Sequence, residues 1–248
     1  MIENIQKEMV FPITIASFDV GPDDRLRLSA VLRYQQEAAE RQLAPGGLGW
    51  QGLSEKGMAF VASRWHTCIE RLPKMGEQVT LTTWHRERRG PRFFRCYDWR
   101  DAKGRVLLQG VMQFALVSVE DHRLLRGEEF DVFGLPDQPE RRVDCDDPAR
   151  WREPTMQEAG EFSVRWSDTD RNGHMNNTRY ADLLCDALPG GMDGRQLTDV
   201  QLYFAGETLP GETLTLSAGT DAEGRLYVAG AHGRGTAFSA AVRYMISD

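Results

Sequence analysis

The segment Trp166-Ser-Asp-Thr-Asp-Arg-Asn-Gly-His-Met-Asn-Asn-Thr-Arg-Tyr180 decides how the rest of the chain is interpreted. Acidic, amide and imidazole side chains occupy alternate positions, which an extended segment would project to one side: Asp168, Asp170, Asn172 and His174. Asn176 and Asn177 are good N-cap residues, and they precede a short helical pattern that runs to Leu188. The free N–H groups at a helix start favour developing negative charge. This combination predicts a site that hydrolyses an ester or a thioester.

Two other interpretations of the segment compete with this one. A polar cluster before a helix is often only a cap and a turn. The spacing Asp168-x-Asp170-x-Asn172-Gly173 also opens like a calcium-binding EF-hand loop. That loop needs a bidentate glutamate at its twelfth position, where this chain has Arg179, and no amphipathic helix leads into the segment. We therefore exclude calcium, and we expect no metal and no cofactor.

Composition places the chain among ordinary globular proteins. The 248 residues suffice for one large domain or two smaller ones, and 41% of them are hydrophobic. The net charge of −7 gives no global field that would attract nucleic acid. No signal peptide and no membrane-spanning apolar run is evident, so we expect a cytoplasmic protein that binds neither nucleic acid nor membrane. The cysteines lie far apart in the sequence and are interpreted as free thiols: Cys68, Cys96, Cys145 and Cys185.

The order of predicted elements repeats along the chain. A helical pattern covers residues 29–43, and strands are expected at 10–20, 58–70, 77–85, 93–100 and 105–119. After an acidic, proline-bearing connection, the second half has a strand at 161–167, the helix to Leu188, and strands near 198–206, 212–218, 225–232 and 237–246. The segment beginning Glu70-Arg-Leu-Pro73 also echoes the one beginning Glu207-Thr-Leu-Pro210.

This repetition predicts a duplicated α+β unit, in which a helix is wrapped by an antiparallel sheet, the tandem (double) hotdog arrangement. We expect an N-terminal hotdog at residues 1–140, a linker at 141–160 and a C-terminal hotdog at 161–248. In the first half the segment that matches the polar motif, Asp19-Val-Gly-Pro-Asp-Asp-Arg-Leu26, has neither His nor Asn. Only the second copy is therefore expected to carry chemistry.

The same residues resemble a known family. The segment Trp166–Tyr180 is similar to the signature of the acyl–acyl-carrier-protein thioesterases, which are double-hotdog enzymes of plant plastids and many bacteria. In the first half, Phe60-Val-Ala-Ser-Arg64, Ile69-Glu-Arg-Leu-Pro73 and Gly76-Glu-x-Val-x-Leu-x-Thr-Trp84 look like the N-terminal hotdog of that family. The resemblance spans nearly the whole chain. It implies hydrolysis of medium- or long-chain acyl–acyl carrier protein to free fatty acid, with acyl carrier protein as the partner.

The resemblance also implies a set of catalytic residues. The Asp-x-Asn-x-His set of the family falls on Asp170, Asn172 and His174, and its catalytic glutamate falls on Glu207 in Phe204-Ala-Gly-Glu207. The plant members have a cysteine after that glutamate, whereas this chain has Thr208, which puts a cysteine nucleophile in doubt. Thioester hydrolysis needs a group that activates water and donors that stabilise the oxyanion, and this set can supply both. Which carboxylate acts as the base is left open, and Asp168 is interpreted as structural.

Substrate and carrier contacts are assigned to other stretches. Arg88, Arg89 and Arg92 lie in the strongest basic cluster, which suits an acidic carrier protein, with a solvated hairpin loop as the alternative interpretation. Trp50 is a candidate for the wall of an acyl tunnel, against plain core packing as the alternative. The remaining histidines, among them His66, show no metal-ligand spacing and are interpreted as incidental. Alternative functions are a hotdog thioesterase or dehydratase acting on acyl-CoA, and a non-catalytic acyl-binding hotdog protein. The chain is expected to be a monomer or a homodimer.

Overall fold

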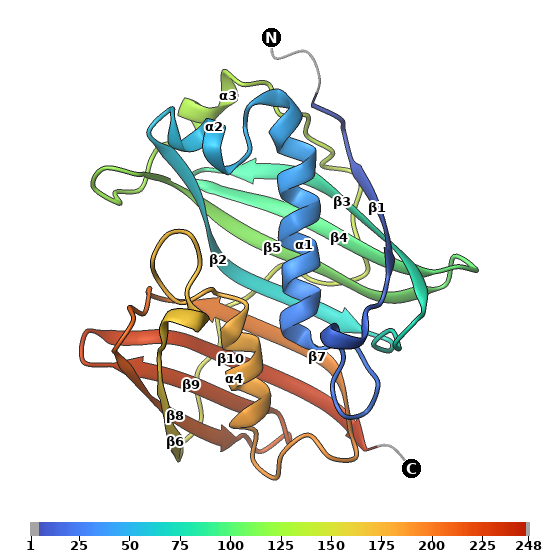
Figure 1. Ribbon diagram of the computed structural model, residues 1–248, viewed down its shortest axis with the longest axis vertical. Helices are drawn as coiled ribbons and strands as arrows, with labels where there is room; N and C mark the ends of the chain where they lie inside the picture. The colour runs from blue at the N-terminus through green and yellow to red at the C-terminus, as the bar shows by residue number, and fades with distance from the viewer. Residues whose placement is uncertain (1–4, 247–248) are drawn as a thin grey trace. The chain divides into compact units, whose positions relative to one another are not determined.

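The computed structural model describes residues 5–246 and divides the chain into two compact units (Figure 1). The first unit comprises the chain up to Leu26 together with Val31–Pro148, and the second comprises Arg27–Ala30 and the chain from Ala149 onward. The boundary after Pro148 falls within the linker expected at 141–160. Residues 1–4 and 247–248, which the expected domains include, lie outside the described residues.

An antiparallel sheet with strand order β1-β3-β4-β5-β2 forms the first unit. Its strands are β1 (Met9–Thr14), β2 (Met58–Ile69), β3 (Gln78–Arg89), β4 (Arg92–Asp101) and β5 (Val106–Ser118). Helix α1 (Leu28–Leu43) lies across one face of this sheet (Figure 1). On that face Trp65 Nε1 donates to Gln35 Oε1 at 3.0 Å, which satisfies the indole of a fully buried tryptophan.

The opposite face of the first sheet is covered by the chain that leaves the unit. Val143 packs against a small apolar cluster formed by Trp84, Phe94, Cys96 and Val111. Trp84 Nε1 donates to the carbonyl of Arg141 at 3.0 Å, and the Arg141 guanidinium lies 3.9 Å above the same indole ring. Residues 141–147, which we call the connection, therefore pack on the sheet instead of crossing open surface.

The second unit is a smaller copy with strand order β7-β10-β9-β8-β6. Its strands are β6 (Gln157–Ser163), β7 (Arg195–Phe204), β8 (Thr213–Thr220), β9 (Leu226–His232) and β10 (Gly235–Ile246). Helix α4 (Arg179–Asp186) lies across this sheet (Figure 1). Its apolar stripe is buried, and the Tyr180 ring stacks on Phe238 at a centroid distance of 4.9 Å.

The two units correspond strand for strand, since β1 to β5 occupy the positions in the first sheet that β6 to β10 occupy in the second. Equivalent backbone bonds confirm the match: Ile15 N donates to Glu77 O at 3.0 Å, and Val164 N donates to Glu212 O at 2.9 Å. The predicted α+β duplication, with a helix laid on an antiparallel sheet in each half, is confirmed.

Several local predictions differ from the structure, among them the strand expected at 161–167, which is observed at Gln157–Ser163. The strand expected at 10–20 ends at Thr14, and a 3₁₀ turn at Ser17–Asp19 follows it. Strand β3 continues to Arg89, because Gly90 adopts a positive φ of 60° and closes a tight hairpin onto Arg92. The short helices α2 (Trp50–Ser54) and α3 (Glu128–Asp131) were not expected, since each is too short to show a helical period.

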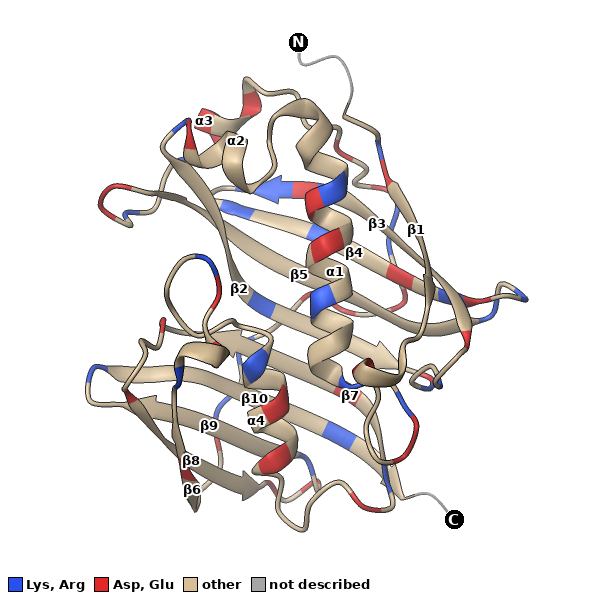
Figure 2. Cartoon of the chain, viewed as in Figure 1, with Lys and Arg blue, Asp and Glu red and all other residues tan. Residues whose placement is uncertain are grey.

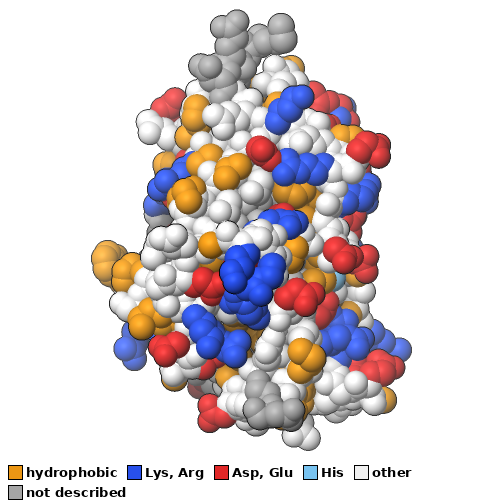
Figure 3. Space-filling model, turned by 90° about the vertical axis from the view of Figure 1, so that its right-hand side faces the viewer, with side chains coloured by type: hydrophobic (Ala, Val, Ile, Leu, Met, Phe, Trp, Pro, Cys, Tyr) orange, Lys and Arg blue, Asp and Glu red, His pale blue; other side chains and the backbone are white. Residues whose placement is uncertain are grey.

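Charged side chains of both signs are interspersed on the surface. Both acidic and basic residues lie along α1 (Figure 2), and the basic groups on the face drawn in Figure 3 are bordered by acidic ones. Within residues 5–246, no helix combines the length and the apolar character that a membrane crossing requires.

A glutamate closes the turn before the third strand of each unit. Glu77 receives two hydrogen bonds from Arg71, at 2.9 and 2.6 Å, and one from Lys74 N at 3.1 Å. Glu212 receives two from Arg234, at 2.8 and 2.9 Å, and one from Leu209 N at 2.6 Å. The hydrogen bonds from Arg234 lower the pKa of Glu212 to about 2, and those from Arg71 lower the pKa of Glu77.

These carboxylates predict a loss of stability in acid. A carboxylate whose pKa is depressed by folding stabilises the folded state above its ordinary pKa, and loses that contribution as the pH falls through its folded pKa. We expect the urea midpoint to fall as the pH is lowered from 4.5 towards about 2. Glu212→Gln should lower the midpoint at neutral pH and flatten this acid dependence.

Glu223→Gln provides the matched control, because Glu223 is exposed in a hairpin loop and its substitution should leave the profile unchanged. A Glu212→Gln protein with the same acid dependence as the original chain would contradict the assignment.

Candidate functional site

The polar motif forms a closed turn and not the extended segment that alternation suggested. An isolated bridge joins Thr169 to Met175, and Asp170 N donates to His174 O at 3.0 Å. Gly173 N donates to Asp170 O, and the positive φ of 81° at Gly173 allows the chain to reverse there. The turn at 169–175 therefore gathers the polar side chains by folding back on itself, where an extended segment would have projected them to one side.

Within this turn Asp170 links the other two residues of the motif. Asp170 Oδ1 accepts a hydrogen bond from Asn172 N at 2.8 Å and lies 3.9 Å from His174 Nδ1. The His174 and Asp170 side chains are 31% and 22% exposed, so both are reachable by a ligand. An imidazole next to a carboxylate, with a carboxamide two residues before it, can transfer a proton and donate a hydrogen bond.

Asp168 and Asn176 flank the turn and have structural partners. Asp168 is 8% exposed; its carboxylate accepts from Arg165 N at 3.0 Å and from Arg179 Nε at 3.2 Å. Asn176 Oδ1 accepts from Thr178 N at 2.9 Å, and Asn176 O accepts from Arg179 N at 2.9 Å. These bonds occupy N–H groups at the start of α4, so the oxyanion donor must be sought elsewhere.

Glu207 lies beyond the end of β7, which stops at Phe204, and its side chain is exposed. Its backbone is held from β9 and the hairpin that follows: Glu207 O accepts from His232 Nε2 at 3.1 Å and from Arg234 Nη2 at 3.0 Å. Arg234 thereby connects this carbonyl to the Glu212 carboxylate. Sequence analysis did not identify His232 or Arg234 as part of the site. Each binds a backbone carbonyl, and such a contact produces no recognisable sequence motif.

Two hydrogen bonds bring the turn and the Glu207 segment together. Met175 N donates to Thr208 O at 2.7 Å, and the hydroxyl groups of Tyr180 and Thr208 lie 2.9 Å apart. Thr208 is fully buried, and burial raises the pKa of Tyr180. Thr208 therefore joins helix α4 to the segment that carries Glu207, and its hydroxyl is not open to a substrate.

The first unit repeats this framework with different side chains. Leu26 N donates to Pro73 O at 2.8 Å, as Met175 N does to Thr208 O. The equivalent turn places Arg25 where the second unit has His174, and Leu72 where it has Glu207. The sequence echo had aligned Glu70 with Glu207, and the hydrogen-bond register corrects that alignment by two residues. Among the described residues, the full set of Asp170, Asn172, His174 and Glu207 has no equivalent in the first unit.

The basic residues assigned to carrier binding are partly neutralised within the first unit. Arg88 forms a bidentate pair with Asp131 at 3.0 and 2.7 Å, and Arg89 pairs with Asp147 at 2.9 Å. Arg92 is exposed at the start of β4. Trp50 begins α2, is 38% exposed, and donates its backbone N–H to the Glu40 carboxylate at 2.9 Å.

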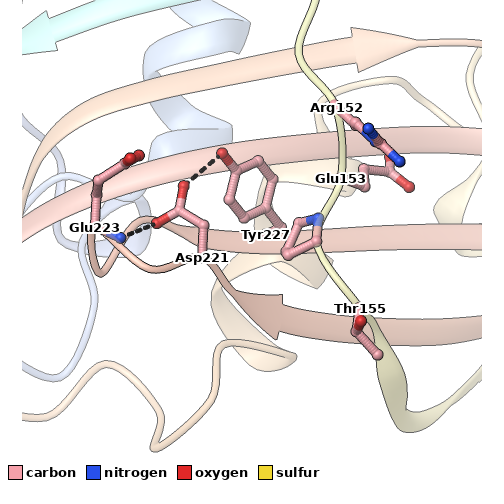
Figure 4. Close-up of a pocket in the computed structure, with 7 residues that line it drawn as sticks. Arg152, Glu153, Thr155, Asp221, Glu223 and Tyr227 are labelled. Carbon is pink, nitrogen blue, oxygen red and sulfur yellow. Dashed lines mark hydrogen bonds between the residues drawn. The ribbon is translucent and has the colours of Figure 1, made fainter.

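An open depression in the second unit lies apart from all these residues. It is lined by Arg152, Glu153, Pro154, Thr155, Asp221, Glu223 and Tyr227. In Figure 4 Asp221 accepts from Tyr227 Oη at 2.9 Å and from Glu223 N at 3.0 Å, so its carboxylate is used to close a hairpin. Because the Asp221 carboxylate is used in this way, we assign this depression no catalytic role.

Comparison with known proteins places these observations in a family. Residues 7–129 match the acyl-ACP thioesterase N-terminal domain, and residues 152–233 match the acyl-ACP thioesterase C-terminal domain. A chloroplast dodecanoyl-acyl-carrier-protein hydrolase from Cinnamomum camphora is 26% identical over 197 residues, which is 73% of this chain and 51% of that protein. A chloroplast palmitoyl-acyl carrier protein thioesterase from Arabidopsis thaliana is 25% identical over 212 residues, which is 77% of this chain and 50% of that protein. The chain thus spans about half the length of the curated relatives it matches.

Solved structures agree with the fold. An acyl-ACP thioesterase from Bacteroides thetaiotaomicron superposes with a TM-score of 0.87 at 17% identity, covering 96% of this chain and 98% of that one. The 12:0-ACP thioesterase from Umbellularia californica gives a TM-score of 0.81 at 19% identity and covers 98% of both chains. With both domain models matched in order and the double hotdog fold in place, the chain belongs to the acyl-ACP thioesterase family.

Proposed function

We propose that this chain hydrolyses the thioester of medium- or long-chain acyl–acyl carrier protein, releasing free fatty acid and ending chain elongation. The observation that carries the proposal is the pairing of the Asp170–His174 turn with the Glu207 segment through the Met175–Thr208 backbone bond. Family membership supports the substrate class, and the dodecanoyl- and palmitoyl-acyl carrier protein activities of the relatives support the chain lengths. The cytoplasmic location and the monomeric or dimeric state expected from the sequence stay predictions.

The proposed chemistry assigns one role to each residue of the set. Glu207 takes a proton from water as the water oxygen attacks the thioester carbon, and the Asn172 carboxamide donates a hydrogen bond to the oxyanion. The carbon–sulfur bond then breaks, the departing thiolate receives a proton from His174, and the proton that Glu207 took from water passes through solvent to His174, which restores both residues. Asp170 orients the His174 ring, in keeping with their 3.9 Å separation. The products are a carboxylic acid and the carrier thiol.

The first test removes the imidazole or the carboxamide. We expect His174→Ala and Asn172→Ala to lower kcat by about 100-fold or more on acyl–acyl carrier protein, since each deletes an acid–base group or an oxyanion donor. Hydrolysis of a panel of acyl–carrier-protein and acyl-CoA thioesters, with circular dichroism as a check of folding, measures the effect.

The first unit supplies matched controls for this test. Arg25→Ala and Asp23→Ala change the equivalent positions of the equivalent turn, and both should keep kcat near that of the original chain. Folded His174→Ala protein with normal turnover would refute the assignment. A chain that binds acyl groups but hydrolyses none would support a non-catalytic hotdog protein instead.

The second test concerns the nucleophile. Thr208 is fully buried and bonded to Tyr180, so Thr208→Val should retain most of kcat while losing some stability. Glu207→Gln keeps the shape of the side chain but cannot accept a proton at neutral pH, and should lose nearly all activity. If Thr208→Val were inactive and Glu207→Gln active, the assignment of Glu207 as the base would be wrong, and the base would have to be sought at another residue.

The third test concerns the carrier protein. We propose that Arg92 contributes to docking, because it is exposed, whereas Arg88 and Arg89 already face carboxylates of their own unit. Arg92→Glu should raise KM for acyl–acyl carrier protein more than for acyl-CoA, and added salt should reduce the difference between variant and original chain. Equal effects on both substrates would favour a solvated hairpin, and higher efficiency with acyl-CoA in the original chain would favour the acyl-CoA alternative.

A further inference from the structure

A histidine and two cysteines converge on the face of the first sheet that the connection covers. His66 and Cys68 are two residues apart on β2, so both side chains project from the same face of the strand. Cys145 belongs to the connection. The ligand atoms of these residues all lie within 4.8 Å of one another, although the sequence separates the cysteines by 77 positions. The interpretation of His66 as incidental rested on sequence spacing, which does not reveal this grouping.

The His66 ring is oriented as the ring of a metal ligand is. Its Nδ1 lies 2.9 Å from the carbonyl oxygen of Asp146, and because a carbonyl only accepts, Nδ1 carries the proton. In the neutral ring the lone pair then lies on Nε2, which is 3.8 Å from Cys68 Sγ. Metal-bound histidines usually donate their other ring N–H to a backbone carbonyl or a carboxylate in this way. His66 is 5% exposed, so the ring has little freedom to turn away.

The two sulfur atoms are already in contact. The Cys68 thiol donates to Cys145 Sγ at a sulfur–sulfur distance of 2.7 Å. Two thiolates on one tetrahedral zinc ion lie about 3.8 Å apart, given Zn–S bonds of about 2.3 Å, whereas a disulfide requires about 2.05 Å. Binding an ion therefore needs an opening of roughly 1 Å, which Cys145 can provide because the connection has no helix or strand at that point.

The third ligand favours a metal over a disulfide. A disulfide between Cys68 and Cys145 would involve two of the three converging atoms, whereas a thiophilic cation binds all three. Two sulfurs and one imidazole nitrogen match the preferences of zinc and leave a fourth position for water. We propose that His66, Cys68 and Cys145 bind one thiophilic divalent cation of the zinc class, which fastens the connection to the first sheet.

The proposed site adds to an existing set of contacts along the connection. Asp144 N donates to Gln109 Oε1 at 3.0 Å, and Asp147 Oδ1 lies 2.6 Å from Arg86 Nη2. These bonds hold the chain to the first sheet on either side of Cys145. A bound ion would add a third point of attachment between them. The site is independent of the proposed thioesterase activity, whose residues belong to the second unit.

Metal titration of the whole chain tests the proposal. The protein is stripped with a chelator, kept reduced with a phosphine, and titrated with Zn²⁺ against a chromophoric chelator and with Co²⁺ alone. We expect one ion per chain, a sulfur-to-cobalt charge-transfer absorption, and a rise in the thermal midpoint on Zn²⁺ addition. Cys68→Ser, Cys145→Ser and His66→Gln should each weaken Zn²⁺ binding by at least about 100-fold.

Cys185→Ser is the matched control, because it removes a half-buried cysteine of the second unit and should bind Zn²⁺ like the original chain. His66→Gln keeps both thiols, so it decides the matter if a serine variant fails to fold. Absence of Zn²⁺ binding in the reduced chain would overturn the proposal, as would binding that survives loss of either cysteine. A Cys68–Cys145 disulfide found by mass spectrometry in untreated protein, with no metal binding after reduction, would show a redox link instead.

Discussion

The backbone hydrogen bond from Met175 N to Thr208 O, 2.7 Å long, is the contact on which the candidate site depends. It ties the turn before α4 to the segment after β7, and so brings residues more than thirty positions apart into one place. Because only backbone atoms take part, side chains on either segment can change without loss of the contact. The first unit shows this directly, since Leu26 N and Pro73 O form the same bond at 2.8 Å between segments of different composition.

Comparison of the two duplicated units separates residues that maintain the fold from residues to which we assign catalysis. Both turns have an aspartate in the preceding 3₁₀ segment that binds an arginine of the following helix: Asp19 with Arg33 at 2.9 Å, and Asp168 with Arg179 at 3.2 Å. This shared pair supports a structural role for Asp168, although the residue stands within the polar motif. The residues that differ between the turns, His174 against Arg25 above all, are those to which the proposed function assigns chemistry.

Both faces of the first sheet are covered, one by α1 and the other by the connection. Basic residues of its strands are therefore paired with carboxylates of the connection. Arg86 is 2% exposed, and its guanidinium is paired with Asp147 of the connection and stacked over Phe94. Burying a cation is costly unless a carboxylate and hydrogen bonds compensate it, so the acidic connection and the basic strand stabilise each other. The positive cluster in the sequence is therefore partly an internal ion-pair network. Its acidic partners Asp131 and Asp147 lie 43 residues beyond Arg88 and 58 residues beyond Arg89.

The amino-acid sequence by itself determined the elements and their order, because periodicity, turn residues and caps are local. It indicated the duplication, the α1 helix at 29–43, the strands, and the turn that carries Asp170, Asn172 and His174. Only the tertiary structure decided the register that aligns Leu72 with Glu207, the burial of Thr208 against Tyr180, and the support of Glu207 by His232 and Arg234. It also brought His66 and Cys68 to Cys145. These contacts join segments that are distant in the sequence through backbone carbonyls and packed side chains, and neither leaves a periodic signal in the chain.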